Sequence, residues 1–138
     1  ANNWYVNDAS TINDSFTSAA GSNLNHGASI SSPKLTIASV LPLLTAGDTI
    51  YIDAGTFTDS IVILVDSITI IGASSETPII TPSAGAHTIS ATGITNLYIR
   101  SLNIGRTTGA FDAVNLTTCG RGSEWTPSWP STKSPRHC

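Results

Sequence analysis

The stretch GDTIYIDAGTFTDSI, from Gly47 to Ile61, decides the fold class of this chain. It opens with a Gly-Asp turn, continues with alternating apolar residues, and turns again at Gly55 into another apolar run. Glycine allows sharp corners in the backbone, and β-branched and aromatic residues favour strands. Short strands separated by such corners predict an all-β protein.

The same pattern recurs from Asp48 to Leu116. The candidate strands are TIYID, SIVIL, SITIIG, TPII, HTIS and NLYIRSLNIG. Within them, ITII (68–71) lies 29 residues before LYIR (97–100), a Ser or Asn precedes each, and a Gly follows each closely. A repeat of roughly 20–30 residues with short strands is typical of a solenoid. A β-sandwich is the alternative, but mostly apolar runs favour stacked parallel sheets.

One short α-helix is expected before these strands, in SSPKLTIASVLPLLTAG. Ser32 suits an N-cap, Pro33 suits the first helical turn, and Gly47 suits the C-terminal stop. Pro42 ends or kinks the helix because it removes an interior hydrogen bond. The expected apolar face consists of Leu35, Ala38 and Leu41.

The low charge of the chain argues against some classes of partner. Only 11% of the 138 residues are charged, against about 25% in typical soluble proteins, and the net charge is −3. No Lys/Arg cluster is present to replace the counterions of a phosphate backbone, so no nucleic acid partner is expected. No run of about 18 apolar residues occurs, so no membrane span is expected.

The length predicts a single domain. We expect it to cover residues 1–118, with a cap over residues 1–47 and about three coils over residues 48–118. An irregular tail is expected over residues 119–138. An open end of such a solenoid exposes unpaired strands, so we expect a homo-oligomer that assembles through that end.

The composition of the tail differs sharply from that of the coils. No Ile, Leu or Val follows Leu116, and the last twenty residues contain three prolines. The tail is either a flexible end or a cap in which Trp125 and Trp129 cover the open end. Cys119 and Cys138 either form a disulfide that closes the tail or remain free thiols.

Three segments together resemble a known family. WYVNDAS, NHGASISSPKLTIASVLPLLTAGDTIYIDAGTFTDSIVI and SITIIGAS are similar to the N-terminal cap and first coils of secreted right-handed parallel β-helix proteins, the pectate-lyase-like proteins. The resemblance covers residues 4–73 well and 74–116 loosely. It implies a short right-handed parallel β-helix with an N-terminal helical cap, as a truncated or unusually short member. It also implies a secreted or cell-surface location of bacterial type.

The resemblance suggests one catalytic arrangement, and the residues suggest another. Family lyases bind Ca²⁺ through carboxylates and use a Lys or Arg as base, which would make Arg100 the base beside Asp112 or Asp66. An ordinary solvated arginine is the alternative. His87 with Ser90 or Asp112 would make a hydrolytic site for a small ester or lactone, unless His87 is simply a polar surface residue.

A polar loop near the N-terminus is the candidate calcium site. Ca²⁺ takes six to eight oxygen ligands from carboxylates, amides and carbonyls. The candidate ligands are Asn7, Asp8, Asn13, Asp14, Asn23 and Asn25. The alternative is a loop of Asx turns, in which the side chains bond their own backbone.

Three classes of function remain open. The first is a secreted carbohydrate-associated module that binds or cleaves polysaccharide with Ca²⁺. The second is a small hydrolase of an ester, lactone or glycoside. The third is a structural or adhesive piece without catalysis. If the chain is an enzyme, we expect a hydrolase or a polysaccharide lyase, acting on a polysaccharide or a small molecule.

Overall fold

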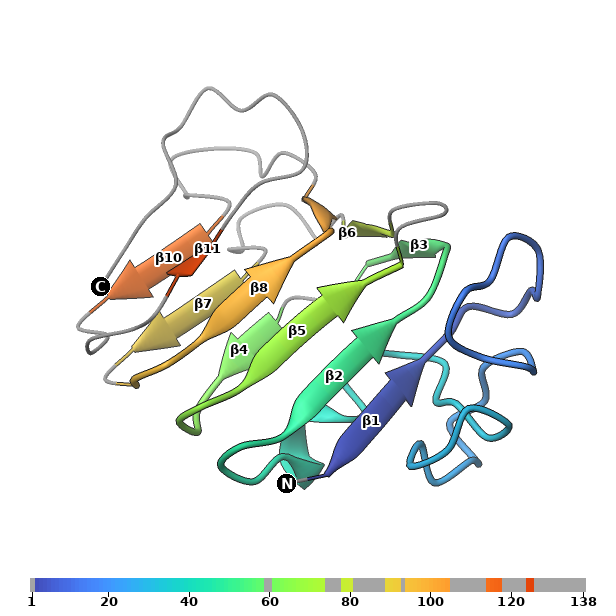
Figure 1. Cartoon of the computed structure of the whole chain (residues 1–138), viewed down its shortest axis with the longest axis horizontal. Coiled ribbons are helices and arrows are strands. Elements are labelled where there is room, and N and C mark those ends of the chain that lie inside the picture. The colour runs from blue at the N-terminus through green and yellow to red at the C-terminus, as the bar shows by residue number, and fades with distance from the viewer. Residues whose placement is uncertain are drawn as a thin grey trace.

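Among the described residues, the regular secondary structure is almost entirely strand, and these strands pair in parallel (Figure 1). The computed structural model describes residues 2–58, 61–73, 78–80, 89–92, 94–104, 114–117 and 124–125. The strands are β1 (Asn3–Val6), β2 (Thr49–Ile52), β3 (Thr56–Phe57), β4 (Ile61–Ile63), β5 (Thr69–Gly72), β6 (Ile79–Ile80), β7 (Ile89–Thr92), β8 (Tyr98–Arg100), β9 (Asn103–Ile104), β10 (Val114–Thr117) and β11 (Glu124–Trp125). The all-β class predicted from the sequence is therefore confirmed.

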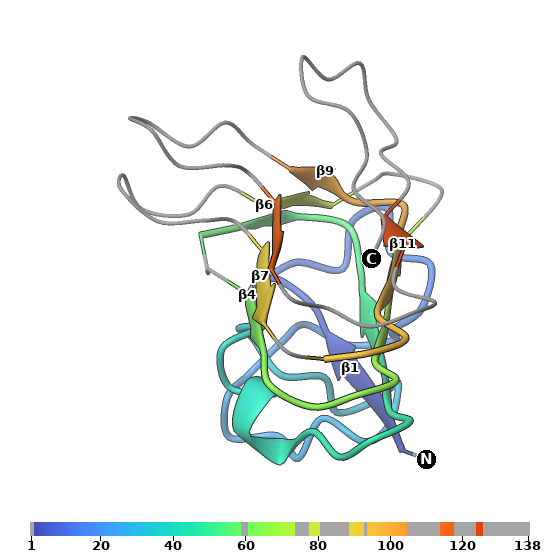
Figure 2. The ribbon, with the colours of Figure 1, turned by 90° about the vertical axis from the view of Figure 1, so that its left-hand side faces the viewer.

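These strands form three parallel sheets. Sheet A has the order β1-β2-β5-β8-β11, sheet B the order β3-β6-β9, and sheet C the order β10-β7-β4. From β2 onward the chain visits sheets A, B and C in turn and then returns to sheet A. Sheet C lies opposite sheet A, and sheet B closes one side between them (Figure 2).

Isoleucine fills the space between the sheets. In sheet A, Ile50 pairs with Ile70 and Ile70 with Ile99, and all three side chains are fully buried. Burial of one such side chain stabilises the fold by about 1.5–3 kcal/mol. The same register pairs Thr69 with Tyr98, so the 29-residue offset noted in the sequence is the spacing of two adjacent strands.

Each of three successive strands of sheet A is preceded by a residue whose backbone has the left-handed conformation, with positive φ. Gly47 has φ 90°, Ser67 has φ 61° and Asn96 has φ 58°, and each stands two residues before its strand. The turns also bond to one another, because the Ser67 N–H donates to the Thr95 oxygen at 2.9 Å. The Ser and Asn noted in the sequence before each apolar strand are therefore the residues that reverse the chain.

The α-helix predicted from Ser32 does not form. Lys34 instead pairs with β1, since its N–H donates to the Tyr5 oxygen (3.0 Å) and its carbonyl accepts from the Asn7 N–H (2.9 Å). Within the described residues, the helical structure is one 3₁₀ turn, η1 (Leu41–Leu43), with Pro42 inside it. Because the backbone of Lys34 is extended and pairs with β1, an α-helix cannot begin at Ser32 and continue through Lys34.

The predicted apolar face of that helix is wrong at two of its three positions, because only Leu41 packs against the core. Leu35 and Ala38 are exposed, whereas Ile37, Val40 and Leu44 are buried in the common core. Contact with the strands, rather than helical periodicity, decides which of these side chains are buried. The first end of sheet A is thus covered by irregular chain, which bonds to the outer edge of β1.

The predicted tail contributes one described element. β11 pairs with β8 in parallel, with Glu124 opposite Tyr98 and Trp125 opposite Ile99. Its backbone therefore continues sheet A, although the sequence pattern places it outside the coils. Cys119, Cys138 and Trp129 lie outside the described residues. In the part of the chain that is described, no helix has the length and apolar character of a membrane span.

Candidate functional site

Asp53 follows β2 and organises the loop after β1. Its buried carboxylate accepts hydrogen bonds at 2.7–2.9 Å from the N–H groups of Ser15, Phe16, Thr17 and Ala54, and from the Thr17 hydroxyl. Burial by itself raises the pKa of Asp53, but these hydrogen bonds outweigh it and the pKa lies below its usual value. Asp53 therefore anchors the polar loop to the end of sheet A.

Three of the predicted metal ligands gather near this anchor. Asn7 is buried, and its Nδ2 donates to Asp14 Oδ2 at 2.6 Å, while its Oδ1 accepts from the Asp8 N–H at 2.9 Å. Asp14 Oδ1 is buried without a hydrogen-bond partner among the described residues. Burial raises the pKa of Asp14, and the negative charges of Asp53 and Asp8 add to this, against the hydrogen bond from Asn7.

The other three predicted ligands lie elsewhere in the cap. Asn23 Oδ1 accepts from the Leu35 N–H at 3.1 Å, and Asn25 Nδ2 donates to the Pro33 oxygen at 2.8 Å. Asn13 is exposed and has φ 63°. Asn23 and Asn25 therefore hold separate cap segments together. The local Asx-turn geometry is seen at Asp8, whose Oδ1 accepts from the Ser10 N–H two residues later.

Calcium binding stays a prediction, with fewer candidate ligands. The side-chain oxygens of Asn7 and Asn23 already accept hydrogen bonds, whereas Asp14 Oδ1 is buried without a hydrogen-bond partner among the described residues. Asp8, Asn13, Asp14 and Asn25 remain as candidates. Among the described residues, no group of three or more His, Cys, Asp and Glu side chains is placed to hold a metal ion. Six to eight oxygens would have to include backbone carbonyls and water.

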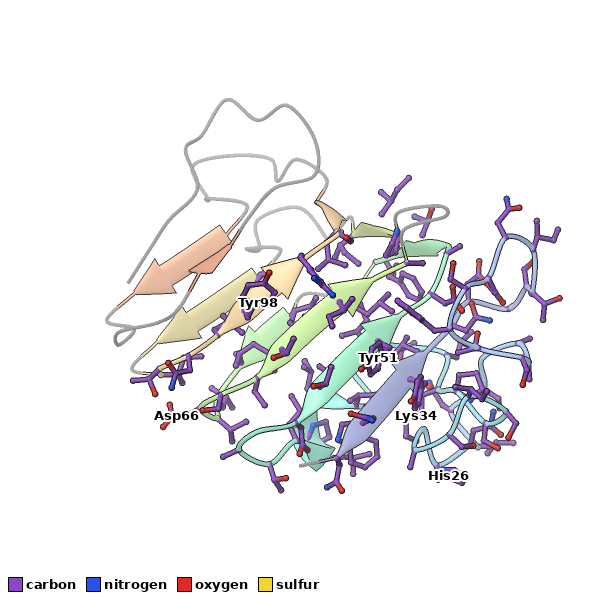
Figure 3. The ribbon with its side chains drawn as sticks, viewed as in Figure 1. His26, Lys34, Tyr51, Asp66 and Tyr98 are labelled. Carbon is purple, nitrogen blue, oxygen red and sulfur yellow. The ribbon has the colours of Figure 1, made fainter. Side chains whose placement is uncertain are left out.

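Strand β8 presents two polar side chains on the outer face of sheet A. Tyr98 and Arg100 are exposed on either side of buried Ile99, and Tyr98 lies over β8 in Figure 3. The register places Thr69 beside Tyr98 and Ile71 beside Arg100. Within the described residues, the Arg100 guanidinium has no ion-pair partner. This face therefore carries a cation next to an aromatic ring, and none of the described carboxylates pairs with it.

The predicted catalytic residues are not brought together in the described part of the chain. Asp66 lies in the turn before β5, where its Oδ1 accepts from the Thr95 N–H at 2.9 Å (Figure 3). Arg100 stands at the far end of the neighbouring strand, so the strands separate the two charges. His87 and Asp112 lie outside the described residues.

A groove of about 250 Å³ lies beside β3, at the edge of sheet B. One wall comes from the cap and the other from the strand. The lining residues are Asp8, Ala9, Leu35, Thr36, Thr56, Phe57 and Thr58. Its volume is below the roughly 300–1,000 Å³ of pockets for drug-sized ligands, so a single small group or a short segment fits it.

Sequence reasoning missed the buried roles of Asp48 and Asp53. Asp48 is fully buried and accepts from the Asn2 N–H (2.8 Å), from Trp4 Nε1 (2.9 Å) and from the Thr45 N–H (2.9 Å). The available signal was their position, because one aspartate stands directly before the apolar strand and the other directly after it. Carboxylates at the ends of buried strands are suited to collect unpaired N–H groups.

No protein-family model, curated protein or solved structure matches this chain. The family resemblance over residues 4–73 therefore stays an expectation.

Proposed function

We propose that the chain folds as a right-handed parallel β-helix of a secreted protein, and that the outer face of sheet A binds acidic polysaccharide. Three parallel sheets visited in the same order support the β-helix. Among the described strands, sheet A has five, whereas sheets B and C have three each. Its parallel strands offer a continuous surface on which an extended polymer lies across several strands.

The observation that carries the binding proposal is the pair Tyr98 and Arg100. A guanidinium presents a planar fork of donors that matches a carboxylate, such as that of a uronic acid, in a bidentate geometry. The neighbouring Tyr98 ring, which is 38% exposed, supplies an apolar face for the carbon–hydrogen side of a sugar. Thr69, beside Tyr98 in the register, adds a hydroxyl for sugar hydroxyl groups.

The test is binding of polygalacturonate by the full chain, with uncharged dextran as the control polymer. We expect polygalacturonate to bind and Arg100→Gln to weaken binding at least about tenfold, which corresponds to roughly 1.4 kcal/mol. Arg100→Lys keeps the charge but loses the fork, and an intermediate affinity is expected. Unsaturated uronate products, followed by absorbance in the same samples, separate cleavage from binding.

Two outcomes would contradict the proposal. One is equal affinity of the unmodified chain and Arg100→Gln for polygalacturonate. The other is equal binding of polygalacturonate and dextran, because the charge of Arg100 would then play no part.

A further inference from the structure

The groove beside β3 lies on a different sheet from Tyr98 and Arg100. It is lined on the side of the cap by Asp8, Ala9, Leu35 and Thr36 and on the side of the strand by residues 56–58. We call its two large apolar residues, Leu35 and Phe57, the floor. Leu35 is 36% exposed and Phe57 is 4% exposed, so the floor is apolar and the rim is open. The groove therefore combines a strand edge, a charged group and an apolar floor.

The strand edge in this groove has unused hydrogen-bonding groups. β3 is the first strand of sheet B and pairs on one side with β6. The Ile79 N–H donates to the Gly55 oxygen at 2.9 Å, so the Gly55 carbonyl points toward β6. Backbone groups of successive strand residues point to opposite sides, so the N–H and C=O of Thr56 point away from β6. Among the described residues, neither group has a hydrogen-bond partner.

The charged group in the groove is the Asp8 carboxylate. Its Oδ1 accepts from the Ser10 N–H at 3.0 Å. Its Oδ2 lies against the backbone of Gly55, where an added Cβ would come within 2.6 Å of it. Gly55 also has φ 149°, so this close approach depends on glycine. Within the described part of the chain, Asp8 has no ion-pair partner.

We propose that this groove binds an extended peptide segment that carries a basic side chain and adds to sheet B along β3. The backbone of the peptide satisfies the N–H and C=O of Thr56, as in other cases of strand addition to a sheet edge. Its basic side chain pairs with Asp8, and an apolar neighbour in the peptide covers the Leu35 and Phe57 floor. Charge complementarity to Asp8 selects a basic peptide over an acidic one.

The probe is a fluorescently labelled acetyl-Thr-Val-Lys-Val-Thr-amide, titrated with the full chain and followed by fluorescence anisotropy. We expect saturable binding and at least about a tenfold loss when the peptide lysine is replaced by glutamate. Asp8→Asn should lose affinity for the lysine peptide to a similar extent, since it removes the charge but keeps an oxygen that accepts from Ser10. Methylation of the peptide nitrogens one at a time should abolish binding at one position only, because β3 has two residues and only the Thr56 carbonyl is free to accept from a peptide N–H.

The matched control is Asp66→Asn, an exposed carboxylate away from the groove, which should leave peptide affinity unchanged. A second variant, Thr56→Pro, removes the free N–H at the edge and should also weaken binding. The proposal is overturned if the peptide does not bind, if the lysine and glutamate peptides bind equally, or if methylation has the same effect at every peptide nitrogen. Loss of polygalacturonate binding in Arg100→Gln leaves this test unaffected, because the two sites lie on different sheets.

Discussion

Two buried aspartates hold the irregular cap onto the strands. Asp48 accepts hydrogen bonds from Asn2 and Trp4 near the N-terminus. Asp53 accepts hydrogen bonds from the loop that includes Ser15 to Thr17. In each case the carboxylate lies at an end of β2, and these donors, unlike the local ones at Thr45 and Ala54, lie more than 35 residues away in the chain. These hydrogen bonds are made to charged groups, which contribute more than neutral ones.

Replacing Asp53 by asparagine should destabilise the chain by roughly 2–4 kcal/mol. The new amide puts an NH₂ group opposite N–H donors, so at least one donor in the loop loses its acceptor. Urea unfolding followed by circular dichroism measures the change. The control is Asp66→Asn, where an exposed carboxylate accepts from Thr95 and the expected loss is below about 1 kcal/mol. Equal losses in the two variants would show that Asp53 is not an anchor.

The same aspartates make the fold sensitive to acid. Burial by itself raises the pKa of Asp48, but hydrogen bonds from Asn2, Trp4 and Thr45 bring the pKa down to about 2. An unfolded Asp has a pKa of about 3.9, so the unfolded state binds the proton more readily. The stabilisation is therefore complete above about pH 4 and is lost as the pH falls toward 2. The lowered pKa of Asp53 acts in the same direction.

Melting temperatures between pH 7 and pH 2 measure this dependence. We expect a steep fall below about pH 4 and a shallower fall in Asp48→Asn, which is less stable at neutral pH but has one titrating group fewer. A melting temperature that is constant down to pH 2 would contradict these protonation assignments.

At the scale of the elements, the turns before sheet A repeat one backbone conformation. Gly47, Ser67 and Asn96 all have positive φ, and the turns bond to each other through Gly47 N–H to Asp66 O and Ser67 N–H to Thr95 O. The left-handed conformation costs L-residues about 1–2 kcal/mol, least for Asn and Asp. Each circuit through the sheets therefore depends on a residue that tolerates this conformation.

The substitution Ser67→Val should destabilise the chain by about 1–2 kcal/mol, because a β-branched side chain is strongly disfavoured at positive φ. Ser67→Asn should be neutral or slightly stabilising, since Asn tolerates the conformation. Thr69→Val, two residues later in extended strand β5, is the matched control and should change stability by less than about 0.5 kcal/mol. Equal effects at both positions in urea unfolding would argue against a conformational role for Ser67.

Calcium binding to the cap loop can be tested at one candidate ligand, Asp14. If Ca²⁺ binds at the orphaned Asp14 oxygen, excess Ca²⁺ should raise the melting temperature relative to EDTA, because a ligand that binds only the folded state stabilises it. At a hundred times the Kd, the stabilisation is about 2.7 kcal/mol. Asp14→Asn should remove the response, whereas Asn23→Ala should keep it. An identical melting temperature in Ca²⁺ and EDTA would leave the loop as a set of Asx turns.

At the scale of the whole molecule, the two ends of the sheets differ. At the first end, the edge of β1 is covered by Gly27 and Lys34, which bond to Tyr5. At the other end, β11, β9 and β10 are the last described strands of sheets A, B and C. Unpaired strand edges favour association with another chain. We therefore retain the expectation of a homo-oligomer that forms through this end.

Light scattering after size exclusion tests the assembly on the full chain and on a version that ends at Thr118. The shorter version lacks β11, so the edge of β8 is uncovered. We expect the full chain to associate as its concentration rises, and the shorter version to melt lower and associate more strongly. A monomer at high concentration for both versions would contradict assembly through this end.

The local pattern of the sequence was sufficient for most of the strands and for their spacing. The 29-residue offset between ITII and LYIR equals the register of β5 and β8, because matching apolar side chains must face one core. The Ser and Asn before these strands were visible too, since a turn that reverses the chain at positive φ selects such residues. The strand boundaries needed tertiary information, because β3, β10 and β11 match none of the candidate runs and NLYIRSLNIG divides into β8 and β9.

The sequence by itself thus determined an all-β chain of short strands with a repeat near 30 residues. Only the tertiary structure decided that residues 32–41 are not a helix, that Asn7, Asp8 and Asp14 approach Asp53 while Asn23 and Asn25 do not, and that Arg100 is separated from Asp66. The physical reason is the range of the interactions. Strand periodicity acts between near neighbours in the chain, whereas the hydrogen bonds that place the cap, such as Ser15 to Asp53, join residues 38 positions apart.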